Sequence, residues 1–129
     1  MGWSPDGLKK NRVSTILYGG TESDRRAFAV NASEELDGAG LIEAKDAQSL
    51  ERALSNGRAV VYVPDLTVLP AVTQRAVVRV LREREERPKL VLGLSMSPET
   101  ALEKGALTED LKYWLSRSTI DVKARASRR

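Results

Sequence analysis

The sequence predicts a three-layer α/β fold in which a parallel, five-stranded sheet lies between two layers of helices. Apolar, strand-like runs alternate along the chain with segments of helical periodicity. Two of the runs, residues 59–66 and 89–95, are apolar at both odd and even positions, as is typical of strands covered on both faces of a parallel sheet. A chain of 129 residues, 41% hydrophobic and 30% charged, fits one compact globular domain.

Five strands are expected, each for a reason in its composition. The first is β-branched and ends in Gly19-Gly20, which marks a turn, and the second is a short apolar run. The third and fourth are the doubly apolar runs, and the fifth is again short and β-branched. In chain order, the strands are expected at residues 13–19, 41–44, 59–66, 89–95 and 119–124.

Helices are expected between the strands, with two of them before the last strand. Thr21 and Asp24 have the spacing of a capping box, which predicts the start of the first helix. The helices are expected to begin near residues 21, 46, 70, 97 and 108. At the charged end of the third helix, Arg82 is expected to pair with Glu86 four residues on. This order of elements predicts right-handed crossovers between parallel strands.

The chain is expected to form a single domain over residues 13–124. Residues 1–12 are polar, and we expect them to form an irregular lead-in. Residues 125–129 form a basic tail, for which a frayed, solvated terminus is a simpler interpretation than a contact with phosphates or an acidic partner. The net charge of the whole chain is +3, which is too small to predict a nucleic-acid partner.

The composition excludes several classes of chemistry. The chain has no cysteine and no histidine, so disulfides, thiol catalysis, zinc sites built from these residues and imidazole acid–base catalysis are excluded. No apolar run approaches the roughly 20 residues of a membrane-spanning helix. The first residues lack the apolar segment of a signal peptide, and a cytoplasmic protein without a membrane partner is therefore expected.

The carboxyl ends of the predicted strands are the expected place for a ligand, as in other parallel sheets. Gly19 and Gly20 follow the first strand, and Arg25 and Arg26 stand in the first turns of the helix after it. Backbone N–H groups and two cations at such a junction can bind an anion. The simpler interpretation is that both arginines are exposed and are paired with the acidic residues of the same turn.

Three further residues are candidates for function. Asp65 follows the third strand and is either a lone catalytic acid or, by the simpler interpretation, the cap of the next turn. Tyr113 and Trp114 are adjacent aromatic residues on the last predicted helix and form a candidate protein interface. Because this helix must bury one face, one of the two is expected in the core.

Two segments carry a resemblance to a known family. The segment RAVVYVPDLTVLPAVTQRAVVRVLRE, residues 58–83, resembles the Walker-B strand and following helix of the sigma-54-dependent transcription activators, which are AAA+ ATPases. The segment EKGALTEDLKYWLSRSTIDV, residues 103–122, is similar to a later part of the same family. The matching residues are Leu69, Pro70, Gln74, Arg79, Val80, Leu81, Gly105, Glu109, Asp110, Leu111, Tyr113, Leu115, Thr119 and Ile120. The resemblance covers about residues 13–122 and implies a P-loop NTPase fold with strand order 5-1-4-3-2.

The resemblance implies that the phosphate-binding loop is degenerate. In the family's pattern, Gly20 takes the place of the first glycine, but Arg25 takes the place of the second. Arg26 stands where the family has lysine, and Ala27 stands where it has a side-chain oxygen for Mg²⁺. An arginine side chain at the second glycine crowds the backbone that wraps the phosphates, and arginine does not replace the compact charge of lysine.

The other nucleotide-handling positions of the family are also replaced. Pro64 and Asp65 occupy the places of the acidic Walker-B pair, so the first acid is lost. Ala106, Thr108 and Trp114 occupy the places of the arginines that contact nucleotide, and without them the transferred phosphoryl group is not stabilised. The family's G-A-F-T-G-A loop is missing before the third strand, and the helical lid would lie beyond residue 129.

These differences predict a non-catalytic, AAA+-like module, a pseudo-ATPase, that binds another protein in bacterial transcription regulation or signalling. No enzyme activity is expected, neither ATP nor Mg²⁺ is expected to bind, and a hexameric ring is not expected. Two alternatives are a nucleotide or phosphate sensor that binds through the glycine turn without hydrolysis, and a receiver-like signalling domain. A receiver has strand order 2-1-3-4-5, which separates it from the other two.

Overall fold

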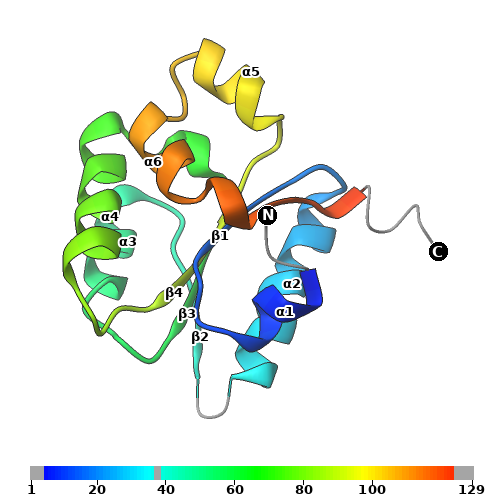
Figure 1. Cartoon of the computed structure of the whole chain (residues 1–129), viewed down its shortest axis with the longest axis vertical. Helices are drawn as coiled ribbons and strands as arrows, with labels where there is room; N and C mark the ends of the chain where they lie inside the picture. Colours follow the sequence, from blue (N-terminus) through cyan, green and yellow to red (C-terminus); the bar gives the residue numbers. More distant parts are fainter. Residues whose placement is uncertain (1–4, 37–38, 124–129) are drawn as a thin grey trace.

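The computed structural model describes residues 5–36 and 39–123 of the chain. Its centre is one five-stranded sheet in which every strand pairs in parallel with its neighbours, in the order β2-β3-β4-β1-β5 (Figure 1). Read from the other edge, this is the predicted order 5-1-4-3-2, and the receiver-like alternative is wrong because its order differs. The strands are β1 Thr15–Tyr18, β2 Leu41–Glu43, β3 Val60–Val63, β4 Lys89–Gly93 and β5 Thr119–Asp121.

Helices cover both faces of the sheet (Figure 1). The α-helices are α1 Pro5–Lys10, α2 Glu22–Glu35, α3 Ala47–Ala53, α4 Ala71–Glu83, α5 Pro98–Glu103 and α6 Glu109–Trp114. Two short 3-10 turns, η1 Leu66–Val68 and η2 Ser116–Ser118, precede α4 and β5. In Figure 1, α3, α4 and α6 lie on one side of the sheet, and α1 and α2 lie on the other. The predicted three layers are therefore confirmed.

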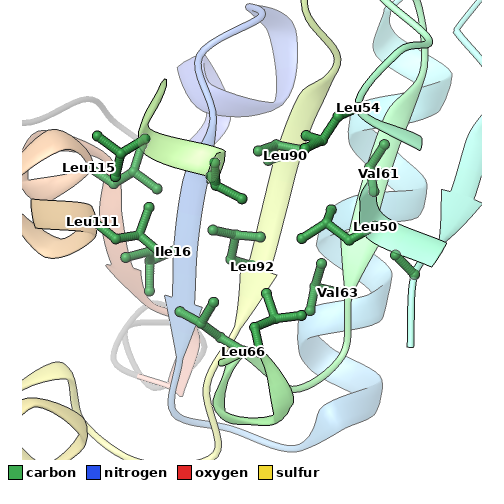
Figure 2. Packing of buried hydrophobic residues seen from close by; sticks show 14 of the residues in the cluster. Ile16, Leu50, Leu54, Val61, Val63, Leu66, Leu90, Leu92, Leu111 and Leu115 are labelled. Atoms are coloured by element: carbon green, nitrogen blue, oxygen red, sulfur yellow. The ribbon is translucent and has the colours of Figure 1, made fainter. Parts of the chain in front are cut away.

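The core consists of one apolar cluster on each face of the sheet. Alternate residues of β3 enter different clusters: Val61 and Val63 face α3 and α4, whereas Val60 and Tyr62 face α2. The larger cluster is shown in Figure 2, where side chains of β1, β3 and β4 meet those of α3, η1 and α6. The double burial predicted from the apolar runs is confirmed, because all four residues of β3 and all five of β4 are buried.

The expected irregular lead-in over residues 1–12 is wrong, because residues 5–10 form the helix α1. Leu8 of this helix is fully buried in the smaller cluster, together with Phe28 of α2. A helix of 6 residues is too short to be stable alone, so its contact with α2 supplies the stabilisation. A single leucine among polar residues gives no helical periodicity, which is why the sequence did not predict α1. The basic tail, residues 125–129, lies outside the described residues.

The expected pair between Arg82 and Glu86 is also wrong, because α4 ends earlier than its charge pattern suggests. The helix stops at Glu83, and the next residue, Arg84, is extended with φ −106° and ψ 128°. Arg82 instead pairs with Glu83 at 2.8 Å, and Arg84 donates a hydrogen bond to the carbonyl oxygen of Leu54. A helical spacing of four residues pairs side chains only while the helix continues.

Lys89, the first residue of β4, is a charged residue in the core. Its side chain is fully buried, and its ammonium group donates a hydrogen bond to the carbonyl oxygen of Val13. Burial lowers the pKa of Lys89 to about 8, with a smaller contribution from the positive charge of Arg12. The folded protein therefore releases this proton at a lower pH than the unfolded chain does.

This pKa shift predicts that the free energy of unfolding rises between about pH 8 and pH 10.5, because the unfolded lysine keeps its proton over this range and the folded one does not. Lys89→Met is expected to remove roughly 2–3 kcal/mol of that rise. Urea unfolding at the two ends of the range measures it. Lys104→Met, which replaces an exposed lysine, serves as the control and is expected to keep the wild-type slope. Equal pH slopes for Lys89→Met and the wild type would contradict the assignment.

Candidate functional site at the carboxyl ends of the strands

The loop after β1 is a tight glycine turn. Gly19 has φ 74° and Gly20 has φ 59°, both in the left-handed region that favours glycine. The turn lies where β1 passes between β4 and β5 in the sheet, which is the place predicted for a ligand. The backbone N–H of Leu94, just after β4, donates to the carbonyl oxygen of Leu17 and holds the neighbouring strand end against the turn.

The first turn of α2 satisfies its own backbone. Thr21 is the N-cap: its hydroxyl oxygen accepts a hydrogen bond from the N–H of Asp24 at 3.1 Å, and its own N–H donates to the Asp24 carboxylate at 2.9 Å. The predicted capping box is therefore confirmed. These hydrogen bonds hold the pKa of Asp24 below its usual value. The carboxylate of Asp24 thus occupies the helix N-terminus, where an anionic ligand would be expected.

Arg25 is buried against the glycine turn rather than exposed on the surface. Only 6% of the residue is exposed. Its Nη1 donates a hydrogen bond to the carbonyl oxygen of Gly19 at 2.8 Å and a longer one to the carbonyl oxygen of Gly20 at 3.5 Å. Its Nε is buried without a hydrogen-bond partner. The simpler interpretation, an exposed arginine paired with an acidic residue of its turn, is wrong for Arg25. The turn presents carbonyl oxygens to a guanidinium group of its own chain.

Arg26 forms the centre of a polar network between α2, β2 and β3. Its guanidinium pairs with Glu22 at 3.1 Å and with Glu43, and it lies 5.2 Å from the centre of the Tyr62 ring. The Tyr62 hydroxyl donates to Glu22 at 2.7 Å. The hydrogen bond from Arg26 lowers the pKa of Glu43, and burial together with the bond to Glu22 raises the pKa of Tyr62. The pairing of Arg26 with an acid of its own turn is confirmed.

The end of β5 packs directly against the glycine turn. A Cβ atom added to Gly19 would lie 2.2 Å from Oδ1 of Asp121, and one added to Gly20 would lie 2.7 Å from the Asp24 carboxylate and 2.9 Å from Val122. The turn therefore has little free volume on this side. It is also flanked by two carboxylates, those of Asp24 and Asp121, which repel an anion.

Asp65 acts as a local cap at the end of β3. Its Oδ1 accepts hydrogen bonds from the N–H of Thr67 at 3.0 Å and from the Thr67 hydroxyl at 2.6 Å, and it begins η1. The interpretation of Asp65 as a capping residue is therefore confirmed. Pro64, which precedes it, has its carbonyl oxygen only 2.7 Å from the place of a Cβ on Gly93, so the ends of β3 and β4 are closely packed.

Gln74 of α4 is a buried side chain that joins three separate backbone groups. The sequence singled it out only as a residue that matches the resembled family, and did not predict these contacts. Its Nε2 donates to the carbonyl oxygens of Leu69 at 2.9 Å and Ala106 at 2.8 Å. Its Oε1 accepts from the N–H of Thr108 at 2.9 Å. The side chain is 2% exposed and holds the segment before α6 in place. This segment contains Ala106 and Thr108, which stand where the family that the sequence resembles has arginines.

Tyr113 and Trp114 are both exposed on α6. Tyr113 is 76% exposed and Trp114 is 44% exposed, and their rings meet edge to face with centroids 6.4 Å apart. The expectation that one of them lies in the core is wrong, because Leu111 and Leu115 supply the buried face of this segment. The two aromatic residues line a shallow groove of about 500 Å³ together with Val13, Ser116, Arg117 and Ser118.

Two negative findings apply to residues 5–36 and 39–123. No cluster of three or more acidic side chains in this part of the chain has the arrangement of a metal site. Over the same residues, no helix combines the length and the apolar character needed to cross a membrane.

Comparison with solved structures places the fold among P-loop NTPase and AAA+-like domains. NtrX from Brucella abortus, solved in complex with ATP, has a TM-score of 0.71 and 14% identity, and the match covers 92% of this chain. The P-loop NTPase domain of a sigma-54 transport activator from E. coli has a TM-score of 0.63 and 15% identity, with 90% of this chain and 92% of that chain covered. A DNA polymerase III gamma subunit-related protein from Thermotoga maritima has a TM-score of 0.56 and 15% identity, with 91% of this chain and 43% of that chain covered.

This chain spans 33% of the length of the NtrX chain. No protein-family model matches the sequence, and no curated protein sequence matches it. The likeness at 14–15% identity therefore concerns the fold, which is the P-loop NTPase/AAA+-like fold that the resemblance implied.

Proposed function

We propose that this chain is a non-catalytic, AAA+-like protein-binding module that acts in transcription regulation or signalling. The observation that carries the proposal is the position of Arg25. In a working phosphate loop, backbone N–H groups surround the phosphates. Here the carbonyl oxygens of Gly19 and Gly20 instead accept hydrogen bonds from the buried guanidinium of Arg25, so the turn is held by a cation of its own chain.

The residues present do not fit a nucleotide with its Mg²⁺. Ala27 has no oxygen for the metal, and Pro64 replaces the first Walker-B acid. Asp65 remains, but its Oδ1 already accepts two hydrogen bonds from Thr67. Magnesium sites of phosphoryl-transfer enzymes use a carboxylate together with phosphate oxygens, so this set of side chains lacks the usual protein ligand.

The local charge gives a second argument against a bound phosphate. Asp24 caps α2, and the Asp121 carboxylate lies against Gly19, so the mouth of the turn carries two acids. Arg26 is already engaged by Glu22 and Glu43. These contacts disfavour the alternative of a nucleotide or phosphate sensor as well, because Arg26 is paired with two acids and the buried Arg25 already donates to the glycine turn.

A protein-binding role is supported by the aromatic pair on α6. Tyrosine and tryptophan are enriched at the centres of protein interfaces, and exposed neighbouring rings cost little conformational entropy on binding. Tyr113 and Trp114 keep their exposure while the rest of α6 is anchored through Leu111. Arg117 in the same groove adds a cation to this surface. We therefore assign the α6 groove as the partner-binding surface of the module.

The proposal predicts that MgATP at about 5 mM shifts the melting temperature by less than roughly 1 °C, because only a ligand of the folded state stabilises it. No release of phosphate above the rate in protein-free buffer is expected. A sigma-54 activator ATPase domain with an intact phosphate loop, assayed in parallel, is the positive control. A saturable rise in melting temperature or measurable turnover would refute the non-catalytic assignment.

The binding part of the proposal is measured separately by affinity capture on the purified chain. The double variant Tyr113→Ser/Trp114→Ser is expected to lose the captured partner. Its free energy of unfolding, measured with urea, is expected to stay within about 0.5 kcal/mol of the wild-type value because both rings are exposed. If the partner is retained by the variant, the α6 groove is not the binding surface.

A further inference from the structure

The helix α4 presents a second, chemically different surface. Its buried side carries Thr73, Gln74, Val77 and Val78, which pack toward the sheet. The opposite side carries Val72, Arg75 and Arg79, and Val68 lies in η1 just before the helix. We call Val68, Val72, Arg75 and Arg79 the valine–arginine face. Figure 1 shows α4 at the edge of the molecule.

The apolar part of this face is unusually exposed. Val72 is 63% exposed and Val68 is 52% exposed, although Leu69 and Leu66 beside them are buried in the larger cluster. The valines are thus not needed to complete the core. A single exposed valine is ordinary on a protein surface, so the distinguishing feature of this face is that two of them stand four residues apart beside two arginines.

The charged part of the face has no counter-ion of its own. Arg75 and Arg79 are exposed, and among the described residues neither makes a salt bridge or a side-chain hydrogen bond. Arg82, one turn further on, differs because it pairs with Glu83. α4 contains no acidic residue before Glu83, so the first three turns of this helix carry only positive charge.

The exposed valines and the arginines that are unpaired among the described residues together indicate which side chains a partner would need. The face runs from valine to arginine along one helix, and Val72 and Arg79 are about 10 Å apart at 1.5 Å per residue. A segment that places an aliphatic side chain at one end and carboxylates about two helical turns away matches this pattern. Charge complementarity of this kind steers association and fixes the register of the bound segment.

A protein segment is favoured over nucleic acid by two observations. The exposed Val68 and Val72 gain nothing from a phosphate backbone, whereas they gain from burial against aliphatic side chains. Beyond Arg79 the positive charge does not continue, because residues 82–87 carry as many glutamates as arginines and offer no basic track for a phosphate backbone.

We propose that the valine–arginine face binds an acidic, amphipathic segment of a partner protein, with aliphatic side chains on the two valines and carboxylates on Arg75 and Arg79. This inference goes beyond the proposed function, because it adds a surface distinct from the α6 groove and states the chemistry of what binds there.

The test uses the full chain and a displayed library of random peptides of about 12 residues, long enough for a three-turn helix. Peptides are selected on the wild type, and the best of them is synthesised with a fluorescent label. We expect peptides with net negative charge and aliphatic residues at helical spacing. Arg75→Glu/Arg79→Glu is expected to weaken binding of the labelled peptide at least about 10-fold, and Val72→Ser about 3-fold or more.

A variant with the same change in net charge and a DNA duplex as competitor are the controls for this test. Lys10→Glu/Lys104→Glu changes the net charge by the same amount at other places in the fold and is expected to leave peptide binding unchanged. Circular dichroism verifies that each variant is folded. The proposal is overturned if no acidic peptide is enriched, if Arg75→Glu/Arg79→Glu binds as the wild type does, or if a DNA duplex binds this face more tightly than the peptide. None of these outcomes depends on whether MgATP binds, so a failure here is distinct from a failure of the proposed function.

Discussion

Gln74→Leu is expected to lower the free energy of unfolding by about 2–4 kcal/mol. The wild-type amide satisfies three backbone groups, those of Leu69, Ala106 and Thr108. Leucine fills a similar volume but leaves all three without their partner, beside a side chain that is only 2% exposed. An unsatisfied buried polar group costs more than the hydrogen bond itself contributes.

Urea unfolding of the wild type and the variant measures this loss. Gln48→Leu, at an exposed position of α3, serves as the control and is expected to change the free energy by less than about 0.5 kcal/mol. Gln74→Glu gives a sharper comparison, because a carboxylate can still accept from Thr108 but cannot donate to the two carbonyl oxygens. A loss below about 1 kcal/mol for Gln74→Leu would contradict the role of Gln74 as a connector.

Gly19→Ala is expected to destabilise the fold by roughly 2–3 kcal/mol for two separable reasons. The backbone at Gly19 has φ 74°, which is strained for any residue with a side chain. The new Cβ would also lie 2.2 Å from Oδ1 of Asp121, and that oxygen accepts a hydrogen bond from the N–H of Lys123 at 2.9 Å. The Asp121 side chain must move, and the hydrogen bond to Lys123 is lost with it.

Gly105→Ala is the matched control, because it shares the backbone strain without the collision. Gly105 has φ 72°, and nothing lies within 4 Å of the place its Cβ would take. We expect about 1 kcal/mol of destabilisation there, measured by the same urea unfolding. The difference between the two variants then reports the packing of β5 on the glycine turn. Equal losses for the two variants would show that this packing is absent in solution.

The fold was largely predictable because its signals are local and repeated. Strand-like runs that are apolar on both faces, separated by helices, leave few alternatives to a parallel sheet with right-handed crossovers. The capping box of Thr21 and the capping role of Asp65 were also predictable, since each involves a partner only two or three residues away. The strand order came from the family resemblance, and the sheet confirms it.

The candidate site was less predictable because its decisive contacts join distant parts of the chain. Tyr62 reaches Glu22 across 40 residues, and Arg26 reaches Glu43 across 17. Arg25 is buried because the glycine turn folds its carbonyl oxygens back toward α2, and no local pattern separates such an arginine from an exposed one. Burial of a charge is decided by tertiary packing, which residue type alone does not reveal.

The exposure of both aromatic residues on α6 has a similar cause. A short amphipathic helix buries only one stripe, and in this segment Leu111 and Leu115 fill it at a spacing of four residues. Tyr113 and Trp114 fall outside that stripe, although they are among the largest apolar side chains of the chain. Size and hydrophobicity favoured the core for one of them, but the helical spacing of the two leucines decides which face is buried.

The glycine turn, held by Arg25, is proposed to bind no nucleotide, and an NMR titration of the ¹⁵N-labelled chain with MgATP tests this most directly. The reporters are the backbone amides of residues 19–27, and MgCl₂ alone is the control. We expect no saturable chemical-shift change at these amides up to about 10 mM MgATP. A saturable change confined to these amides, with a Kd below about 1 mM, would contradict it.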